Sequence, residues 1–318
     1  MFDVITVGSN TLDVFVDTEA PEIKKKGEKL ITYPVGSKVL IKDTHFSTGG
    51  GGTNTAVSFS RAGLKTGYIG KVGTGDFSRL VLDMLEKENV AFLGATGSKA
   101  NGYSVILESK NDNRTILTHK GENNNLGFNE INKKKLKTKW FYFSSMMGRS
   151  FNAQKRMASY ASKNGIKIGY NPSSYQTSKG LKHLKPILAK TEVLVLNSEE
   201  AGMLVKKEPL KGLREAGPRI VCITKGKEKV TLYNGEHKYT LTPHNVKAKE
   251  RTGAGDAFAS TLIAGLIKGE GVEKSMQLGL ANAESVIMDY GATENLLSWK
   301  ELKKRVKKKP AKIVKEAY

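Results

Sequence analysis

Short runs of β-branched and aromatic residues alternate with stretches of helical periodicity along most of this chain. The runs that predict buried strands are residues 4–7, 66–69, 140–143, 166–168, 193–196 and 220–223. The stretches with helical spacing are residues 54–62, 77–88, 151–163, 178–188 and 199–205. This alternation predicts an α/β fold, doubly wound, whose mostly parallel central sheet has helices on both faces. Binding sites in such sheets gather at the carboxyl ends of the strands.

Two segments interrupt the alternation and predict a second, smaller sheet. Residues 30–44 have strand-like flanks around a turn at 34–37, which predicts one hairpin. Residues 102–107 and 114–118 flank a turn-rich stretch at 109–113, which predicts another. We interpret the regions of about 13–44 and 93–118 as a β-sheet lid over one edge of a single domain that covers residues 1–318. Two surface hairpins without a closing role are the alternative.

The segment Arg251-Thr252-Gly253-Ala254-Gly255-Asp256 runs directly into an apolar stretch of helical periodicity. Two glycines and an alanine at a helix start leave backbone N–H groups unshielded at the positive end of the helix dipole, where an anion can approach. A carboxylate beside such a site suits phosphoryl transfer, because the amides stabilise the migrating charge while the carboxylate takes the acceptor's proton. The alternative is an aspartate that only favours the helix dipole.

Three further segments carry candidate binding residues. The glycine run 49–52 is followed by Asn54, which can donate to and accept from hydroxyls, and it matches neither a P-loop nor a dinucleotide-binding fingerprint. Asp13 follows the first strand and can accept two hydrogen bonds from vicinal sugar hydroxyls, or it is an ordinary turn residue. Asn197 and Glu200 stand where a strand ends and a helix begins, so they could hold Mg²⁺ through water or simply cap the helix.

Composition limits the class of protein. No apolar run approaches the roughly 18 residues of a membrane span, and the first residues predict a buried strand rather than a leader, so we expect a cytoplasmic protein. The single cysteine, Cys222, lies in an apolar run and predicts an inert core thiol. The net charge of +21 favours anionic substrates. The basic tail at 299–318 predicts a solvated terminal helix, or a contact with RNA or another polyanion.

Several motifs together resemble the ribokinase-like (PfkB) family of carbohydrate and nucleoside kinases, from Val4 to about Ala292. The two glycine motifs stand in the family's order and are separated by about two hundred residues. The matching positions are Gly50, Gly51, Asn54, Gly63, 70–73, Asp76, Phe77, Asn171, Pro172, 197–201, 224–226, 252–256 and 281–283. The resemblance implies a central sheet with a β lid. It also implies ATP and Mg²⁺ as cofactors, and transfer of the γ-phosphoryl group of ATP to a hydroxyl of a small sugar or sugar derivative.

The resemblance implies a role for each matching site residue. Asp256 looks like the general base, and the residues that look like the anion hole are Gly253, Ala254 and Gly255. The positions that match the acceptor site are Asp13, Gly50, Gly51 and Asn54. Asn197 and Glu200 match the pair that organises Mg²⁺ and phosphate, with Glu200 acting through water. The positions that match the nucleotide side of the cleft are Thr224, Gly226 and Asn282.

Departures from the family pattern leave two questions open. Glu250 and Arg251 stand where the family usually has Asp-Thr, so dependence on a monovalent cation is open. Arg251 is a candidate to supply the ion's positive charge near the phosphates. Only Asn171 remains of the Asp-x-Asn-x-Arg motif found in many sugar-kinase relatives, so the identity of the acceptor is open as well.

Alternatives also remain for the acceptor and for partners. A nucleoside kinase on the same fold would stack a base on lid aromatics such as Tyr33 or Tyr103, and a phosphorylated sugar is another acceptor to consider. A catalytically idle relative that binds RNA or a protein is the third reading, against which the intact motif around Asp256 argues. We expect no membrane partner and, in spite of the basic charge, no nucleic-acid partner. A homodimer through the lid is left open.

Overall fold

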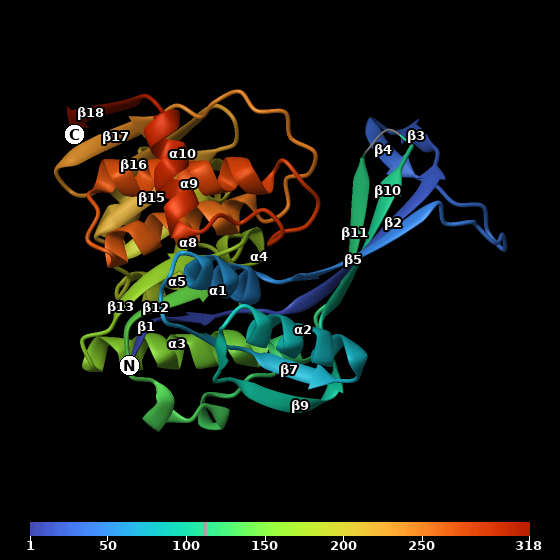
Figure 1. Ribbon diagram of the computed structural model, residues 1–318, viewed down its shortest axis with the longest axis horizontal. Coiled ribbons are helices and arrows are strands. Elements are labelled where there is room, and N and C mark those ends of the chain that lie inside the picture. The colour runs from blue at the N-terminus through green and yellow to red at the C-terminus, as the bar shows by residue number, and fades with distance from the viewer. Residues whose placement is uncertain (111–112) are drawn as a thin grey trace.

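The computed structural model describes residues 1–110 and 113–318. Within them a ten-stranded sheet forms the centre of the molecule, and a four-stranded sheet projects from its side (Figure 1). In spatial order the central strands are β18 (Ile313–Ala317), β17 (His237–Leu241), β16 (Lys229–Tyr233), β15 (Ile220–Lys225), β14 (Val193–Asn197), β13 (Lys167–Asn171), β12 (Thr138–Ser144), β1 (Phe2–Val7), β6 (Thr66–Ile69) and β8 (Ala91–Phe92). The strands from β15 to β8 run parallel, whereas β16, β17 and β18 are antiparallel additions. The predicted fold class is therefore confirmed.

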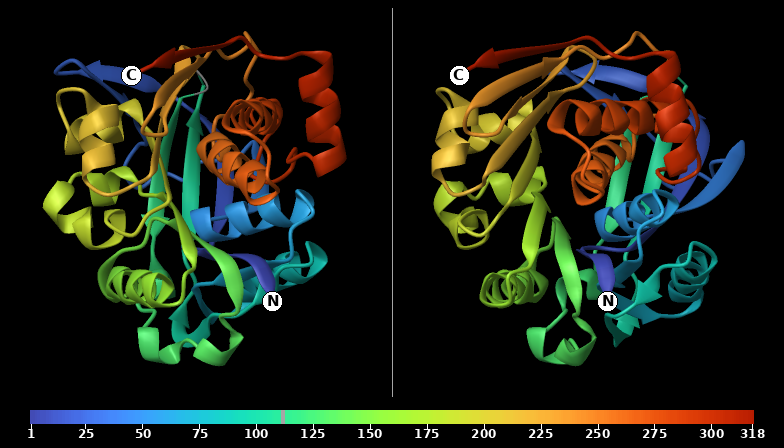
Figure 2. Two further views of the ribbon diagram at one scale, coloured as in Figure 1. Left: turned by 90° about the vertical axis from the view of Figure 1, so that its left-hand side faces the viewer. Right: turned by 60° about the vertical axis from the view of Figure 1, so that its left-hand side comes forward.

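Helices cover both faces of the central sheet (Figure 2). One layer comprises α1 (Gly51–Arg61), α8 (Ala254–Ile267), α9 (Val272–Val286) and α10 (Trp299–Lys308). The other comprises α3 (Gly148–Lys163), α5 (Leu181–Leu188), α6 (Ser198–Leu204) and α7 (Pro209–Glu215). Side chains alternate along β14, so Val193 and Val195 pack against the first layer while Leu194 and Leu196 pack against the second. Burial on both faces explains why these strands are continuous apolar runs in the sequence.

The small sheet, which we call the lid sheet, has the order β11 (Arg114–His119), β10 (Tyr103–Ser109), β2 (Thr11–Ala20) and β5 (Asp43–Gly49). The hairpin predicted from residues 102–118 is confirmed, because β10 and β11 pair antiparallel with Tyr103 opposite His119. The turn predicted at 109–113 includes residues 111–112, which lie outside the described residues. Two further strand pairs join β3 (Glu22–Lys25) to β4 (Glu28–Ile31), and β7 (Lys71–Thr74) to β9 (Ala95–Ala100). Residues 95–100 of the predicted lid region thus pair with β7 and not with the lid sheet.

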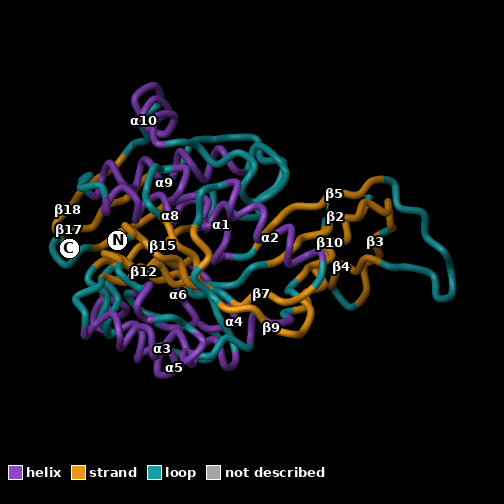
Figure 3. The backbone as a smooth tube through the Cα atoms, turned by 60° about the horizontal axis from the view of Figure 1, so that its bottom comes forward, coloured by secondary structure: helices purple, strands orange, loops and turns teal. Residues whose placement is uncertain are grey.

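The hairpin predicted around residues 34–37 is wrong. Strand β4 pairs with β3 across a tight turn at Lys26 and Gly27, which both have positive φ, and β5 pairs with β2. The residues between β4 and β5 form a long loop at the tip of the lid sheet (Figure 3). The two-residue turn joins β3 to β4 locally. Strand β5 leads into Gly49 opposite Thr11, which places it beside β2.

The basic C-terminal segment is part of the fold. A helix forms there as predicted, and Leu302 and Val306 of α10 are buried against α9. The expectation that the whole segment is a solvated helix is wrong, because residues 313–317 form β18 and pair with β17. Pro310 cannot continue a helix, and the edge of β17 offers backbone groups to the next extended segment.

The remaining helices lie near the ends of strands. Helix α2 (Asp76–Lys87) packs its buried side chains against Tyr68 and α1, and α4 (Ser174–Thr177) follows β13. Cys222 is fully buried in the core, as predicted. Among the helices of the described part of the chain, none is both long and apolar enough to cross a membrane.

Candidate active site

Asp256 lies in the first turn of α8, and Asn54 lies in the first turn of α1. Nδ2 of Asn54 donates a hydrogen bond to Oδ2 of Asp256 at 3.0 Å. Deeper between the two helices, the Ser260 hydroxyl donates to the Ser58 hydroxyl at 2.7 Å. The two glycine motifs of the sequence therefore meet at one place, with the half-buried Asp256 between them.

The start of α8 is open to an anion. Gly253 has a φ of 79°, and a Cβ there would lie 2.5 Å from Cβ of Ala292, so glycine is needed. Within residues 1–110 and 113–318, the amides of Gly253, Gly255 and Asp256 have no hydrogen-bond partner, and the Ala254 amide has only a long contact of 3.4 Å. A Cβ at Gly255 would meet no atom within 4 Å. Free amides with open space in front of them can bind a phosphate group.

Glycines before and within α1 allow close packing around the site. A Cβ at Gly49 would overlap Oδ2 of Asp13. A Cβ at Gly51 would press against Oγ of Ser144 at 3.0 Å and would lie in ordinary contact with Oδ1 of Asp256 at 3.6 Å. Gly50 has a φ of 99°, which other residues rarely adopt. The structure thus places Gly51 and Asn54 beside Asp256, and Asp13 beside Gly49, whereas Gly50 lies against Ser9 and Asn10.

Asp13 lies on β2, where the lid sheet meets the central body. Burial raises the pKa of its carboxyl group, while hydrogen bonds from Ser104 and Thr11 and the positive charge of Lys120 act in the opposite direction. Ser104 is its direct neighbour on β10. A half-buried carboxylate that accepts hydroxyl hydrogen bonds already has the surroundings that a sugar hydroxyl would extend.

The surroundings of Asp256 affect its basicity. Burial raises the pKa of Asp256, and the hydrogen bond from Asn54 lowers it in part. The pKa of the buried Tyr142 hydroxyl is raised by burial and by the negative charge of Asp256. Among the described residues, the Tyr142 hydroxyl and the Ser144 hydroxyl have no hydrogen-bond partner. Sequence reasoning missed both. The signal was the predicted strand at 140–143, because Tyr142 lies within it and Ser144 comes directly after it, at the end of the strand that enters the site.

Asn197 and Glu200 form a reciprocal cap at the start of α6. Oδ1 of Asn197 accepts from the Glu200 amide at 2.8 Å, and Oε2 of Glu200 accepts from the Asn197 amide at 3.0 Å. Burial raises the pKa of Glu200, and the negative charge of Asp256 contributes in the same direction. The capping interpretation therefore holds, and the Glu200 carboxylate also lies within electrostatic reach of Asp256.

The residues predicted for the nucleotide side are only partly brought together. Thr224 is the next-to-last residue of β15 and lies opposite Asn197 of β14. Gly226 comes directly after the strand, with a φ of 48° and open space around it. Asn282 is 1% exposed. Its Nδ2 donates to Oγ1 of Thr261 at 2.7 Å, and its Oδ1 accepts from the backbone amide of Leu297 at 2.9 Å. The structure thus places Asn282 inside the helix packing and not on the surface of the site.

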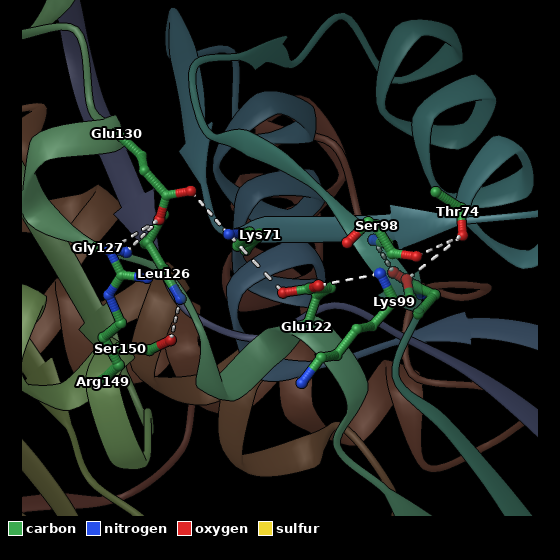
Figure 4. A network of polar contacts seen from close by, with 12 residues as sticks. Lys71, Thr74, Ser98, Lys99, Glu122, Leu126, Gly127, Glu130, Arg149 and Ser150 are labelled. Atoms are coloured by element: carbon green, nitrogen blue, oxygen red, sulfur yellow. Dashed lines mark hydrogen bonds and ion pairs between the residues drawn. The ribbon is translucent and has the colours of Figure 1, made fainter.

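Lys71, part of the matching segment 70–73, fixes the base of the lid sheet. Its ammonium group lies 2.7 Å from Oε1 of Glu130 and 3.8 Å from Oε2 of Glu122 (Figure 4). Glu122 belongs to the short helix η1 (Gly121–Asn124), which follows β11. The side chain of Asn123 in the same helix binds both the amide and the carbonyl of Asn10, at 2.9 and 2.6 Å. The segment that carries Asp13 is therefore tied to the central body.

Glu250 connects the lid sheet to the segment that leads into α8. Its carboxylate accepts from the amides of Arg251 and Thr252, at 2.7 and 3.0 Å, and from the guanidinium of Arg114 on β11. Burial alone would raise the pKa of Glu250, but the bonds from Thr252 and Arg251 and the charge of Arg114 hold it below its ordinary value. Arg251 itself is exposed. Arg114, which sequence reasoning missed, is thus the cation beside Glu250.

The candidate site offers a metal ion separate oxygen ligands rather than a preformed cluster of ligands. Among the described residues, no three His, Cys, Asp or Glu side chains converge as a metal-ligand set. The buried carboxylate of Glu200 fits one contact to Mg²⁺ through water, because Mg²⁺ prefers oxygen ligands and keeps much of its water shell.

Comparisons with known proteins agree with this geometry. The model of the pfkB family carbohydrate kinases matches residues 19–299. An uncharacterized sugar kinase of Archaeoglobus fulgidus is 30% identical over 251 residues, which cover 76% of this chain and 98% of that protein. A 5-dehydro-2-deoxygluconokinase of Clostridium perfringens is 26% identical over 284 residues, or 82% of this chain and 84% of that protein. The crystal structure of ribokinase from Thermotoga maritima matches with a TM-score of 0.80 at 20% identity, covering 96% of this chain and 100% of that one.

The family model spans most of the chain, and the Archaeoglobus relative reaches similar coverage. The site built from Asp256 and the glycine motifs lies inside the matched region. The ribokinase-like fold follows from the structural match, and kinase activity is common to the relatives and neighbours that match. The chain belongs to the pfkB family of carbohydrate kinases and is a phosphotransferase.

Proposed function

We propose that this protein transfers the γ-phosphoryl group of ATP, bound with Mg²⁺, to a hydroxyl of a small sugar or sugar derivative. The observation that carries the proposal is the contact between Asn54 and Asp256, directly beside the partnerless amides at the start of α8. A carboxylate, hydroxyl-binding groups and an anion site are the three components that such a transfer requires.

In the proposed reaction, Asp256 acts as the general base. Its ionised carboxylate accepts the proton of the acceptor hydroxyl as the new oxygen–phosphorus bond forms, and the bond to the leaving ADP oxygen breaks. The pKa of Asp256, raised by burial, makes it a stronger base than a solvated aspartate. The amides of Gly253, Ala254 and Gly255 stabilise the charge on the transferred group.

The other predicted residues take positions around this centre. Asp13 and Asn54 bind acceptor hydroxyls, and Gly50 and Gly51 let the acceptor approach the backbone. Asn197 and Glu200 face the phosphates, where Mg²⁺ held through Glu200 and water would neutralise negative charge. Thr224 and Gly226 line the nucleotide side, whereas Asn282 supports it by fixing α8 to α9.

The test is a coupled assay of ADP release with ATP and Mg²⁺ over sugars, sugar phosphates and nucleosides. We expect release that depends on the acceptor for at least one sugar or sugar derivative. Asp256→Asn serves as the catalytically impaired control. The proposal is contradicted if the folded wild-type protein gives no acceptor-dependent ADP release with any compound tested, or gives it only with nucleosides.

The lid tyrosines favour a sugar over a nucleoside. Tyr33 donates to or accepts from the Thr18 hydroxyl at 3.0 Å, so its hydroxyl has a protein partner. The Tyr103 ring lies 5.9 Å from the Phe77 ring and 5.3 Å from the His119 ring, centroid to centroid. Because Tyr103 already packs between two rings, it is a poor platform for a nucleobase.

We also propose that the protein forms a homodimer through the outer face of the lid sheet. The strand register places Leu117, Val105, Val14 and Phe46 in one row across the four strands. Leu117 is 55% exposed and Phe46 is 56% exposed. The opposite face carries Asp13, Phe15 and Ile106, of which Phe15 and Ile106 are buried. An apolar row on the outer face supports pairing with a second copy, which would also cover the sheet.

A further inference from the structure

Lys120 is held where the lid sheet joins the central body. It follows β11 directly and precedes η1, whose Asn123 is bonded to Asn10. Its backbone position is therefore fixed relative to Asp13, three residues after Asn10. The Lys120 side chain is half-buried.

The acidic residues nearest to Lys120 along the chain do not neutralise it. Glu122 accepts from the Lys99 amide at 3.0 Å and lies 3.8 Å from the ammonium of Lys71. Glu130 binds the same ammonium at 2.7 Å (Figure 4). Within the described residues, Lys120 has no carboxylate within 4.0 Å, the limit for an ion pair, although several exposed lysines of the chain do.

The ammonium group of Lys120 lies near Tyr175 and within electrostatic reach of Asp13. It lies 5.1 Å from the centroid of the Tyr175 ring on α4. Burial lowers the pKa of Lys120, and the negative charge of Asp13 raises it in part. The next residue before Tyr175, Ser174, donates its amide to Glu200. A partly desolvated cation thus lies between the hydroxyl-binding side of the cleft, at Asp13, and the side that leads to the phosphates.

We infer that the acceptor carries an anionic group, a carboxylate or a phosphate, and that Lys120 binds it while Asp13 and Asn54 hold hydroxyls. This rests on the proposed function. With a neutral sugar, the half-buried ammonium would have only the longer-range charge of Asp13 and no ion-pair partner, whereas an anionic group would complete a charge-assisted hydrogen bond. Because Asp13 repels an anion, the group lies on the Tyr175 side of Lys120. Lysine binds either anion as a point charge, so both chemistries fit.

The test compares matched acceptors in the coupled ADP-release assay. One set is ribose, ribonate and ribose 5-phosphate, and the other is fructose, gluconate and fructose 6-phosphate. We expect the wild type to have a higher kcat/KM for an anionic member of a set than for the neutral sugar. Comparison of the sugar acids with the sugar phosphates then shows whether the preferred anionic group is a carboxylate or a phosphate. Lys120→Met should lower kcat/KM for that member by about 10- to 100-fold, mainly through KM, and change the value for the neutral sugar little. Lys120→Arg should restore part of the loss.

Lys155→Met is the matched control. Lys155 also lies over an aromatic ring, 5.2 Å from the Phe151 centroid, but on α3 and away from the cleft. The Lys155→Met variant should have the wild-type kcat/KM for every acceptor. Preference of the wild type for neutral sugars, or equal losses for neutral and anionic acceptors in Lys120→Met, would overturn the inference while leaving the proposed function intact. Absence of turnover with every sugar, sugar acid and sugar phosphate would overturn both.

Discussion

Asn54 donates a hydrogen bond to Asp256 across 202 residues of sequence, at 3.0 Å between Nδ2 and Oδ2. The bond joins the starts of α1 and α8, two helices that each have a glycine of positive φ at the N-cap. One helix start offers room for an acceptor and the other offers partnerless amides. The carboxylate between them is therefore positioned where an acceptor hydroxyl and a phosphate would meet.

Asp256→Asn is expected to lower kcat by about 10²- to 10⁴-fold, the contribution typical of a general base. The amide has nearly the same shape, so the free energy of unfolding and the dissociation constant of the acceptor should change little. Steady-state kinetics and thermal unfolding measure the two effects. The matched control is Asp76→Asn, an exposed aspartate in the first turn of α2. Comparable losses in both variants would remove Asp256 from the role of base.

The pH dependence of kcat should report the Asn54–Asp256 bond. The ionised form of Asp256 is active, so kcat falls as the pH drops through its pKa. The hydrogen bond from Asn54 lowers that pKa. Asn54→Ala removes it, so the pKa should rise and the acidic limb of the profile should move to higher pH. The profile is measured at saturating ATP and acceptor, because loss of the Asn54 amide also raises KM. A limb that stays in place or moves to lower pH speaks against the assignment.

Gly253→Ala and Gly255→Ala should separate stability from activity. At Gly253, the positive φ and the contact with Ala292 predict a loss of about 1–3 kcal/mol in the free energy of unfolding. At Gly255 a methyl group meets no protein atom, so stability should be unchanged or higher by up to about 1 kcal/mol. The same methyl group lies in front of the free amides and should lower kcat/KM for ATP. Denaturant unfolding and kinetics of both variants give the comparison; full activity in Gly255→Ala would exclude close approach of phosphate there.

The strands of the central sheet were predictable because burial on both faces makes each one a continuous apolar run. The turn at Lys26 and Gly27 was missed in favour of 34–37, since proline and glycine mark a turn without showing which strands pair. Site residues carried by a motif, such as Asp256 and Asn54, could be named from the sequence. The role inferred for Lys120 could not, because it depends on the ion pairs of Glu122 and Glu130 with Lys71, which the sequence does not show.

Arg114 should make the enzyme independent of monovalent cations. Its guanidinium donates a hydrogen bond to the carboxylate of Glu250, which also accepts from the amides of Arg251 and Thr252. We expect equal rates in K⁺ and in tetramethylammonium, a cation too large to enter such a site. Arg114→Met leaves the Glu250 charge without its partner, so this variant should be slower and should be stimulated by K⁺ but not by tetramethylammonium. A strong K⁺ requirement in the wild type would contradict the prediction.

Leu117→Glu should convert the proposed dimer to a monomer. Leu117 lies on the outer face of β11 in the apolar row with Val105, Val14 and Phe46, and a charge there would be buried without a partner at a dimer interface. Ile116→Glu is the control, because Ile116 is similarly exposed, at 49% against 55%, but its row continues through Ile106 and Phe15 on the opposite face. Sedimentation velocity measures the mass of each variant. A wild-type monomer would exclude the dimer. Dissociation caused equally by both substitutions would speak against an interface on the outer face. Dissociation by Leu117→Glu alone would assign the interface to the outer face of the lid sheet.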